Sequence, residues 1–458
     1  MGRRPIIKPL PHGSTFILQL SAPGEEPLQH SMTSQKRSCC DVGGSGSSKI
    51  QASGRLKNSI TASSTHSFGY IPCSADVYDV SAVSSATQKV QHILGSKDEF
   101  YRIHRMFMLG RSFANEFQSV VQRLFAHSPR ILSDAYLTAL KLMPSRHEVL
   151  PVVESQDLHI SARCLEILTN GITITSVEDA AVIILLGQAL LVFNTLVPSL
   201  ATESITRGTL LSTKQWYASL INEPSLDAVT LTPVFIDTVD CILRRKVPVV
   251  RLPVLDRCIV DRILGVSTSL LPLLYDFCER SHQTNSARPE HSTPDPVGGI
   301  DDVYCDIECK LNIWTPKIPD DFFSTYTAWE TSVMLAQARA YRHAALLAIH
   351  RLRYPLGVED APAHRLADGI LRGLSLLENW PLDAPTGVAF DFPLLVATLE
   401  LPERGRRLYK AFEPFRFRRQ HSDEILDFID SVIAAQHDGY QGLWFELMEG
   451  RLHGITMT

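Results

Sequence analysis

TSVMLAQARAYRHAALLAIHRLRY, residues 331–354, indicates the fold most clearly, because its apolar residues recur with the period of an α-helix. At about 100° per residue, one side of the expected helix collects seven apolar residues: Met334, Ala338, Tyr341, Ala345, Ala348, Ile349 and Leu352. Pro355 and Gly357 end the pattern. The segment therefore predicts a helix with one face in a hydrophobic core.

The other side of this expected helix is basic. It carries the residues that we regard as candidates for contact with a partner or effector: Arg339, Arg342, His343, His350 and Arg353. One interpretation is a core helix whose basic side is solvated or paired with neighbouring carboxylates. The other is a surface that faces an acidic partner or an anionic effector.

Helical patterns continue outward from this segment over residues 91–458. Thr175 and Glu178 have the spacing of a capping box in front of the apolar run 179–197, which Pro198 ends. Few stretches alternate with the period of a strand, so we expect an all-α, multi-helix domain.

A second clear pattern lies near the C-terminus, at residues 422–436. Its apolar residues follow the i, i+3, i+4 spacing of a helix, with Ser422 as the expected N-cap and Gly439 beyond the end. Between the two patterns, residues 281–299 are rich in Pro, Ser and charge, which predicts a long surface loop.

Residues 1–90 differ from the rest of the chain. They are rich in Ser, Gly and Thr, as in residues 43–48, and no helical or strand period is present. Such a composition cannot bury enough apolar surface to offset the entropy of folding. We therefore expect a disordered leader in front of the helical domain.

Composition excludes several classes of protein. The 458 residues carry 44 Lys+Arg against 49 Asp+Glu, a net charge of -5, so the chain is not a nucleic-acid binder of the strongly basic kind. The most apolar segment, 181–200, is interrupted by Gln188, Asn194 and Pro198, which favours a buried helix over a membrane span. The sequence predicts no membrane association and no secretory signal.

The chain has nine cysteines, an odd number, which are scattered and lie mostly in apolar stretches. This distribution is typical of buried thiols in a reducing compartment rather than of a disulfide framework. The close pairs, Cys39–Cys40 and Cys305–Cys309, do not have the spacing of a zinc knuckle. The sequence predicts no metal and no cofactor.

Motifs for catalysis are equally scarce. The segment 65–69 lacks the first glycine of a nucleophile elbow, and no phosphate-binding loop or H-E-x-x-H pair occurs. We therefore expect that the protein is not an enzyme and that it has no catalytic residues.

The densest basic stretch, residues 404–419, interleaves arginines with Tyr409, Phe412, Phe415 and Phe417. Cations beside stacking rings can bind nucleic acid or serve as an import signal. Alternatively, the rings pack beneath a helix–loop–helix connection and leave the arginine heads in water.

Three ordered segments together resemble the fungal-specific transcription factor domain, the middle homology region of binuclear zinc-cluster regulators. They are 337–357 (QARAYRHAALLAIHRLRYPLG), 392–400 (FPLLVATLE) followed by Arg404, and 442–448 (GLWFELM). The similarity would span about residues 95–455. It implies an all-α regulatory domain that controls transcription, often of a metabolic or secondary-metabolite pathway, in the nucleus or moving between nucleus and cytoplasm.

One feature departs from the family pattern. The zinc cluster of these regulators needs six thiolates at close spacing, and Cys39, Cys40 and Cys73 cannot supply them. The resemblance therefore implies partners that are other transcription proteins or a DNA-binding partner, together with a small-molecule effector. Direct DNA contact and a homodimer stay open, and the alternatives are a helical pathway enzyme, a small-molecule-binding protein or a helical scaffold.

Overall fold

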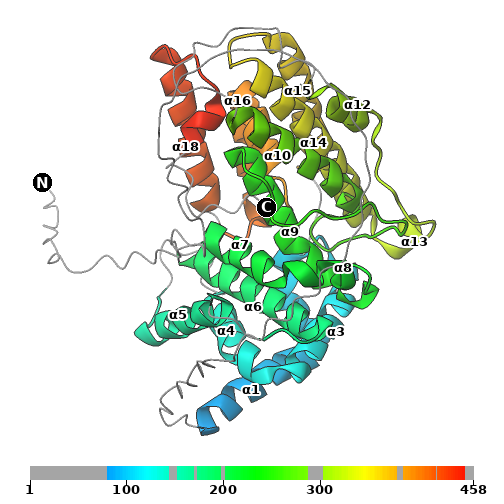
Figure 1. Cartoon of the computed structure of the whole chain (residues 1–458), viewed down its shortest axis with the longest axis vertical. Helices are drawn as coiled ribbons and strands as arrows, with labels where there is room; N and C mark the ends of the chain where they lie inside the picture. The colour runs from blue at the N-terminus through cyan, green and yellow to red at the C-terminus, as the bar shows by residue number, and fades with distance from the viewer. Residues whose placement is uncertain are drawn as a thin grey trace, which may run out of the picture. The chain divides into compact units, whose positions relative to one another are not determined.

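The computed structural model describes residues 80–143, 152–169, 173–197, 202–286, 303–378, 385–418 and 420–448. These residues confirm the predicted all-α class (Figure 1). Within them the only β pairing is an isolated bridge between Asp261 and Gly265. The predicted disordered leader lies outside the described residues up to position 79, and so do Cys39, Cys40, Cys73 and Arg419.

The first half of the described chain forms ten α-helices, of which α6 and α9 are central. Their bounds are α1 (Val80–Gly95), α2 (Lys97–His104), α3 (Ala114–His127), α4 (Pro129–Leu142), α5 (Ser155–Thr169), α6 (Val177–Leu196), α7 (Thr202–Thr213), α8 (Tyr217–Leu220), α9 (Asp227–Arg244) and α10 (Leu271–Ser286). Short 3₁₀ turns connect several of them: η1 (Arg105–Phe107), η2 (Arg111–Phe113), η4 (Lys214–Trp216), η5 (Pro224–Leu226) and η6 (Thr268–Leu270).

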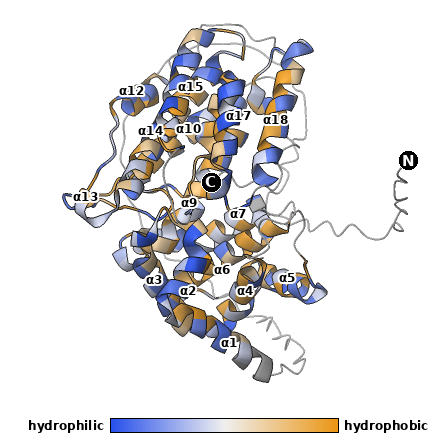
Figure 2. Cartoon of the chain, turned by 180° about the vertical axis from the view of Figure 1, so that it is seen from behind, coloured by the Kyte–Doolittle hydropathy of each residue, from blue (hydrophilic) through white to orange (hydrophobic). Residues whose placement is uncertain are grey.

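The second half is built around α14, which packs against α15 and α16 (Figure 1). Its elements are α12 (Cys305–Ile313), α13 (Phe322–Thr325), α14 (Ala328–Arg353), α15 (Asp360–Ser375), α16 (Asp391–Glu400), α17 (Pro402–Ala411), η7 (Glu413–Phe415), α18 (Gln420–His437) and η8 (Trp444–Met448). Blue and orange residues alternate along most of these helices, as expected where one face of each is buried (Figure 2).

Helix α14 confirms the predicted apolar face, since all seven apolar residues of the expected stripe are buried. The helix begins at Ala328, three residues earlier than expected, because Thr327 and Glu330 form a capping box. Its burial extends beyond the stripe to Ala340, Leu346 and Leu347. The helix is therefore packed on more sides than its amphipathic pattern predicts.

Helix α6 is the predicted buried helix, and nearly all of its residues are covered by other elements. In length and composition it could also cross a membrane, but most of it is buried inside the protein. The predicted cap is wrong by one residue, because Ser176 and Asp179 form the capping box. Thr175 also donates a hydrogen bond to Asp179, so a single carboxylate serves both residues.

Three predicted boundaries are also wrong. Residues 80–90 belong to α1 rather than to the leader, because Val90 and Leu94 enter the core despite the Ser-rich sequence. Residues 281–286 continue α10 rather than opening the loop, since the Arg245 side chain holds Ser281 and Asn285. The rest of that predicted loop, 287–299, lies outside the described residues.

The third error is at α18, which begins at Gln420, so that Ser422 is a buried helical residue and not a cap. The free energy gained by placing Ser at a helix cap is smaller than the free energy gained by burying the helix against its neighbours. Gly439 does lie beyond the end of the helix, as the sequence predicts, and it has a positive φ of 91°.

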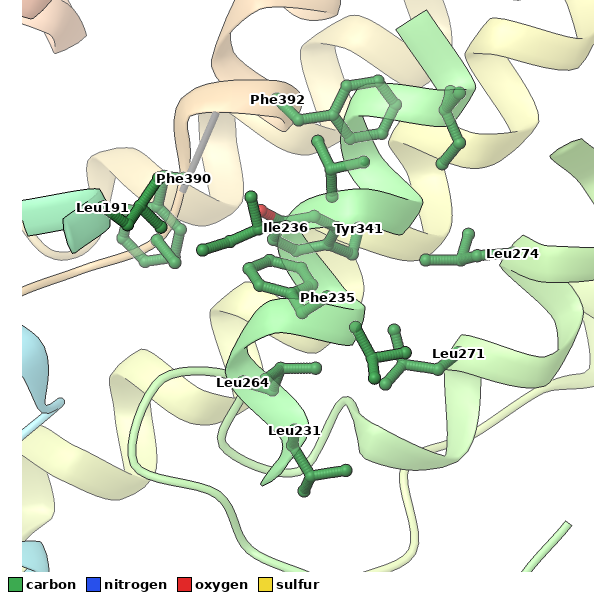
Figure 3. Packing of buried hydrophobic residues seen from close by; sticks show 14 of the residues in the cluster. Leu191, Leu231, Phe235, Ile236, Leu264, Leu271, Leu274, Tyr341, Phe390 and Phe392 are labelled. Atoms are coloured by element: carbon green, nitrogen blue, oxygen red, sulfur yellow. The ribbon is translucent and has the colours of Figure 1, made fainter. Parts of the chain in front are cut away.

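A continuous hydrophobic core joins the two halves of the helical domain. Figure 3 shows its centre, where Phe235 of α9 meets Tyr341 of α14 at a ring distance of 5.3 Å. Tyr341 in turn lies 6.0 Å from the ring of Phe392 on α16. This packing brings residues far apart in sequence together and sets the position of the cavity described next.

Candidate ligand-binding cavity

A cavity of about 150 Å³ lies between the first and second halves of the helical domain. Its walls come from α2, η1, α4, α6 and α9, and from the connections before α16 and around η7. Most of the wall is apolar and includes Phe107, Leu140, Leu185, Leu191 and Ile236.

One polar group on the wall is a hydrogen-bonded pair, His104 and Tyr136. His104 Nδ1 lies 2.7 Å from the carbonyl oxygen of Phe100, and its Nε2 lies 2.5 Å from the Tyr136 hydroxyl. Burial lowers the pKa of His104 to about 4, so the ring is neutral at pH 7. Nδ1–H therefore donates to Phe100, Nε2 accepts from Tyr136, and the lone pairs of the Tyr136 oxygen are left as acceptors.

Arg262 is the second polar group, and it is only 3% exposed. Its Nε donates to the Ala228 carbonyl oxygen at 2.6 Å, and one terminal nitrogen donates to the Phe107 carbonyl oxygen. The other donates to Gln188 Oε1 at 2.8 Å and Thr232 Oγ1 at 3.2 Å.

All the acceptors of Arg262 are neutral, and its remaining close contact is the face of the Phe117 ring, 4.1 Å away. The neighbouring carboxylate of Asp261 instead accepts hydrogen bonds from the backbone of Ile263 and Leu264. Burial lowers the pKa of Arg262 to about 10, which leaves it charged at pH 7. Within the described residues, Arg262 is thus a buried cation without a carboxylate in hydrogen-bond contact.

A third polar group combines Asp391, Arg416 and His421, all of which are buried. Arg416 donates to Asp391 Oδ1, and His421 Nε2 lies 3.2 Å from Asp391 Oδ2. Burial opposes ionisation of Asp391, but Arg416 and His421 outweigh it and hold the pKa of Asp391 below its ordinary value. The Nε–H of Arg416 is buried without a hydrogen-bond partner, which costs free energy unless a further group accepts it.

The five α14 residues that the sequence proposed for contact with a partner or effector do not line this cavity. Arg339 is exposed on α14. Arg342 donates to the Trp314 carbonyl oxygen at 3.2 Å and lies 3.3 Å from His343 Nε2.

The other two candidates connect α14 to its neighbours. His350 is buried with Nε2 2.8 Å from the Glu359 carbonyl oxygen, and Arg353 pairs with Glu308 at 2.7 Å. The basic side of α14 is thus placed largely against neighbouring segments of the same chain, where Arg353 contacts a carboxylate and Arg342 and His350 contact backbone carbonyl oxygens.

The basic and aromatic stretch gives a mixed outcome. The expected packing of its rings is confirmed, because Tyr409, Phe412 and Phe415 are buried. The expectation that the arginine heads remain in water is wrong for Arg416, which enters the cavity wall. Its charge is compensated there by Asp391, a residue 25 positions away whose proximity no local pattern indicates.

None of the six cysteines that the structure describes lines the cavity. Cys164, Cys241 and Cys278 are buried as predicted, whereas Cys258, Cys305 and Cys309 are exposed, because the short segments that carry them lie at the surface. No group of three or more potential metal ligands occurs in the described ranges.

Comparisons with known proteins add no assignment: neither a scan against protein-family models nor searches of curated proteins and solved structures found a match.

Sequence reasoning missed His104, Tyr136, Arg262 and Asp391 as site residues. Each stands alone in an ordinary local context, and they come from four separate segments. Arg416 carried a usable signal, since an arginine between buried aromatic residues is a candidate for burial.

Proposed function

We propose that this protein is a transcriptional regulator of a metabolic or secondary-metabolite pathway that acts in the nucleus through its helical domain. The supporting observation is that the three segments resembling the fungal transcription factor domain fall on packed elements, namely α14, α16 and η8. Such placement is what a shared helical architecture requires. The proposal includes no catalytic step.

Residues within the matched segments also contact one another. Arg351, in the first segment, donates to both carboxylate oxygens of Glu400, the last residue of the second, at 2.6 and 2.5 Å. Gln337, which opens the first segment, donates to the Ala389 carbonyl oxygen at 3.2 Å, just before α16. The first two resembling stretches are therefore coupled parts of one packed unit.

A fusion of the full chain to a heterologous DNA-binding domain tests the proposal. We expect the fusion to change the output of a reporter carrying the matching operator, and the unfused chain to enter the nucleus. A protein that is excluded from the nucleus and leaves the reporter unchanged would contradict the proposal. The DNA-binding domain alone is the control.

A second candidate function, a helical small-molecule-binding protein outside transcription, is favoured by the cavity itself. Apolar cavities with a few convergent polar groups are common ligand sites. The reporter experiment separates the two candidates, because a binding protein without a regulatory role would leave the reporter unchanged whether or not a ligand is present.

A further inference from the structure

The cavity contains more positive than negative charge. Arg262, Arg416 and Arg418 line it, whereas Asp391 is the only carboxylate among the lining residues that the structure describes. Asp391 is in contact with Arg416, and Arg418 lies 3.3 Å from Glu424 outside the wall. The charge of Arg262 is left without a paired carboxylate next to an apolar space.

Neutral dipoles and the nearby carboxylate of Asp261 already stabilise Arg262, and an anion that accepts directly from its guanidinium would stabilise it further. In a medium of low dielectric constant the Coulomb attraction between an anion and Arg262 is much stronger than it is in water. Charge-assisted hydrogen bonds from guanidinium to carboxylate are also stronger than neutral ones. The four hydrogen bonds described for Arg262 leave one of its five N–H groups for such a contact.

A second, independent feature also favours an acceptor group. The Nε–H of Arg416 is buried and has no hydrogen-bond partner, and its side chain belongs to the same wall. An oxygen on a bound molecule would remove the penalty of this unsatisfied donor. Both arginines therefore favour a ligand that bears acceptor oxygens and negative charge.

The apolar walls and the volume limit the rest of the ligand. A cavity of about 150 Å³ lined by apolar side chains is large enough for a benzene-sized molecule. Some wall residues are only half-buried and indicate the side on which the cavity approaches solvent. They are Phe107, Val192, Thr195 and Phe417. The enclosed part of a ligand is therefore about the size of one ring.

We propose that the cavity binds a small aromatic carboxylate, with the ring among the apolar wall residues and the carboxylate accepting from the buried arginines. The inference rests on the proposed function only for the consequence of binding, namely that the ligand is the effector of the regulator. Binding itself is a property of the purified chain.

Three planar molecules of similar shape test the proposal: benzoate, benzamide and benzamidine, with charges of −1, 0 and +1. Calorimetric titration of the full chain should show benzoate binding one to one, about tenfold more tightly than benzamide, because a charge-assisted contact is replaced by a neutral one. Benzamidine should bind more weakly still. Failure of benzoate to bind, or equal affinity for all three, would overturn the proposal.

A substitution then locates the site. Ala189→Leu adds three carbons to a wall residue of α6 and should reduce benzoate affinity at least about tenfold by filling the space. Ala434→Leu makes the same change at an exposed position of α18 and should leave binding unaltered. Undiminished binding by a folded Ala189→Leu protein would overturn the assignment to this cavity. If the variant does not fold, the comparison of the three ligands still tests the proposal, because it uses the unmodified protein.

The reporter fusion distinguishes this inference from the proposed function. Charge-selective binding with an inactive fusion would contradict only the regulatory role. An active fusion in a protein that does not bind benzoate would contradict only the ligand.

Discussion

Arg262 and Arg351 are both buried arginines in the same helical domain, but their surroundings differ in charge. Arg351 is only 1% exposed and contacts two carboxylates, Glu400 and Asp360. It also donates to the carbonyl oxygens of Pro355 and Val358, which follow α14. Arg351 thus joins the end of α14 to α15 and α16.

The hydrogen-bond acceptors of Arg262 are neutral, the nearby carboxylate of Asp261 accepts from backbone N–H groups instead, and a cavity lies beside the guanidinium. The difference teaches that burial of a cation alone does not identify a site. A bound anion would add little stabilisation to an arginine that already contacts carboxylates. It would stabilise an arginine that contacts none and lies beside a cavity. Four predictions sharpen this comparison.

The largest effect is expected for Glu400→Ala. The substitution leaves Arg351 buried with only Asp360 as an ionic partner, and it should lower the free energy of unfolding by about 3–5 kcal/mol. Urea denaturation measures this loss. Glu403→Ala on the exposed side of α17 is the control, with an expected change within about 0.5 kcal/mol. A small effect at Glu400 would mean that the pairing of Arg351 does not stabilise the fold.

The next effect is a loss of stability on acidification through His104. Its pKa falls from about 6.5 in the unfolded chain to about 4 in the fold, mainly because of burial. Between these two pKa values the unfolded state binds a proton that the folded state does not. The contribution of the neutral His104 to the free energy of unfolding is therefore fully present above pH 6.5. It should fall by about 3 kcal/mol as the pH drops from about 6.5 to about 4.

Denaturation curves between pH 7 and 4 measure this effect. A double variant, His104→Phe with Tyr136→Phe, removes both members of the hydrogen-bonded pair and should lack this part of the pH dependence. An identical pH dependence in the double variant would contradict the assignment of the titration to His104.

A smaller loss is expected for Arg262→Met. The substitution removes four hydrogen bonds to neutral acceptors and breaks no hydrogen bond to a carboxylate, and water entering from the cavity can satisfy the released acceptors. We expect a loss of about 2 kcal/mol in the free energy of unfolding, less than for Glu400→Ala. If Arg262→Met were the more damaging of the two, Arg262 would be mainly a structural residue.

The smallest effect is expected for an exposed arginine. Arg406 pairs with Asp430 of α18 at the surface. Arg406→Ala should change the free energy of unfolding by less than about 1 kcal/mol, and even less in high salt, because exposed pairs are screened by solvent and ions. Unfolding in low and high salt provides the measurement. A loss comparable to that of Glu400→Ala would remove the distinction between buried and exposed pairs.

Much of the fold could be predicted from local patterns, because helix periodicity and capping act within a few residues. The apolar face of α14, the buried α6 and the position of Gly439 beyond the end of α18 were all predictable in this way. The errors at Thr175, Ser281 and Ser422 have one origin. A cap or breaker signal is worth about 1 kcal/mol, and burial or a side chain from a distant segment can outweigh it.

The sequence by itself determined the helical class and the apolar stripe of α14 that enters the core, because a period of 3.6 residues is a property of neighbouring positions. Only the tertiary structure decided which buried arginine is paired. Glu400 is 49 residues from Arg351, and the acceptors of Arg262 come from α6, α9 and η1. Whether a charge is compensated depends on side chains that packing brings within a few ångströms of it. The distance between two side chains in the fold cannot be predicted from their separation along the chain.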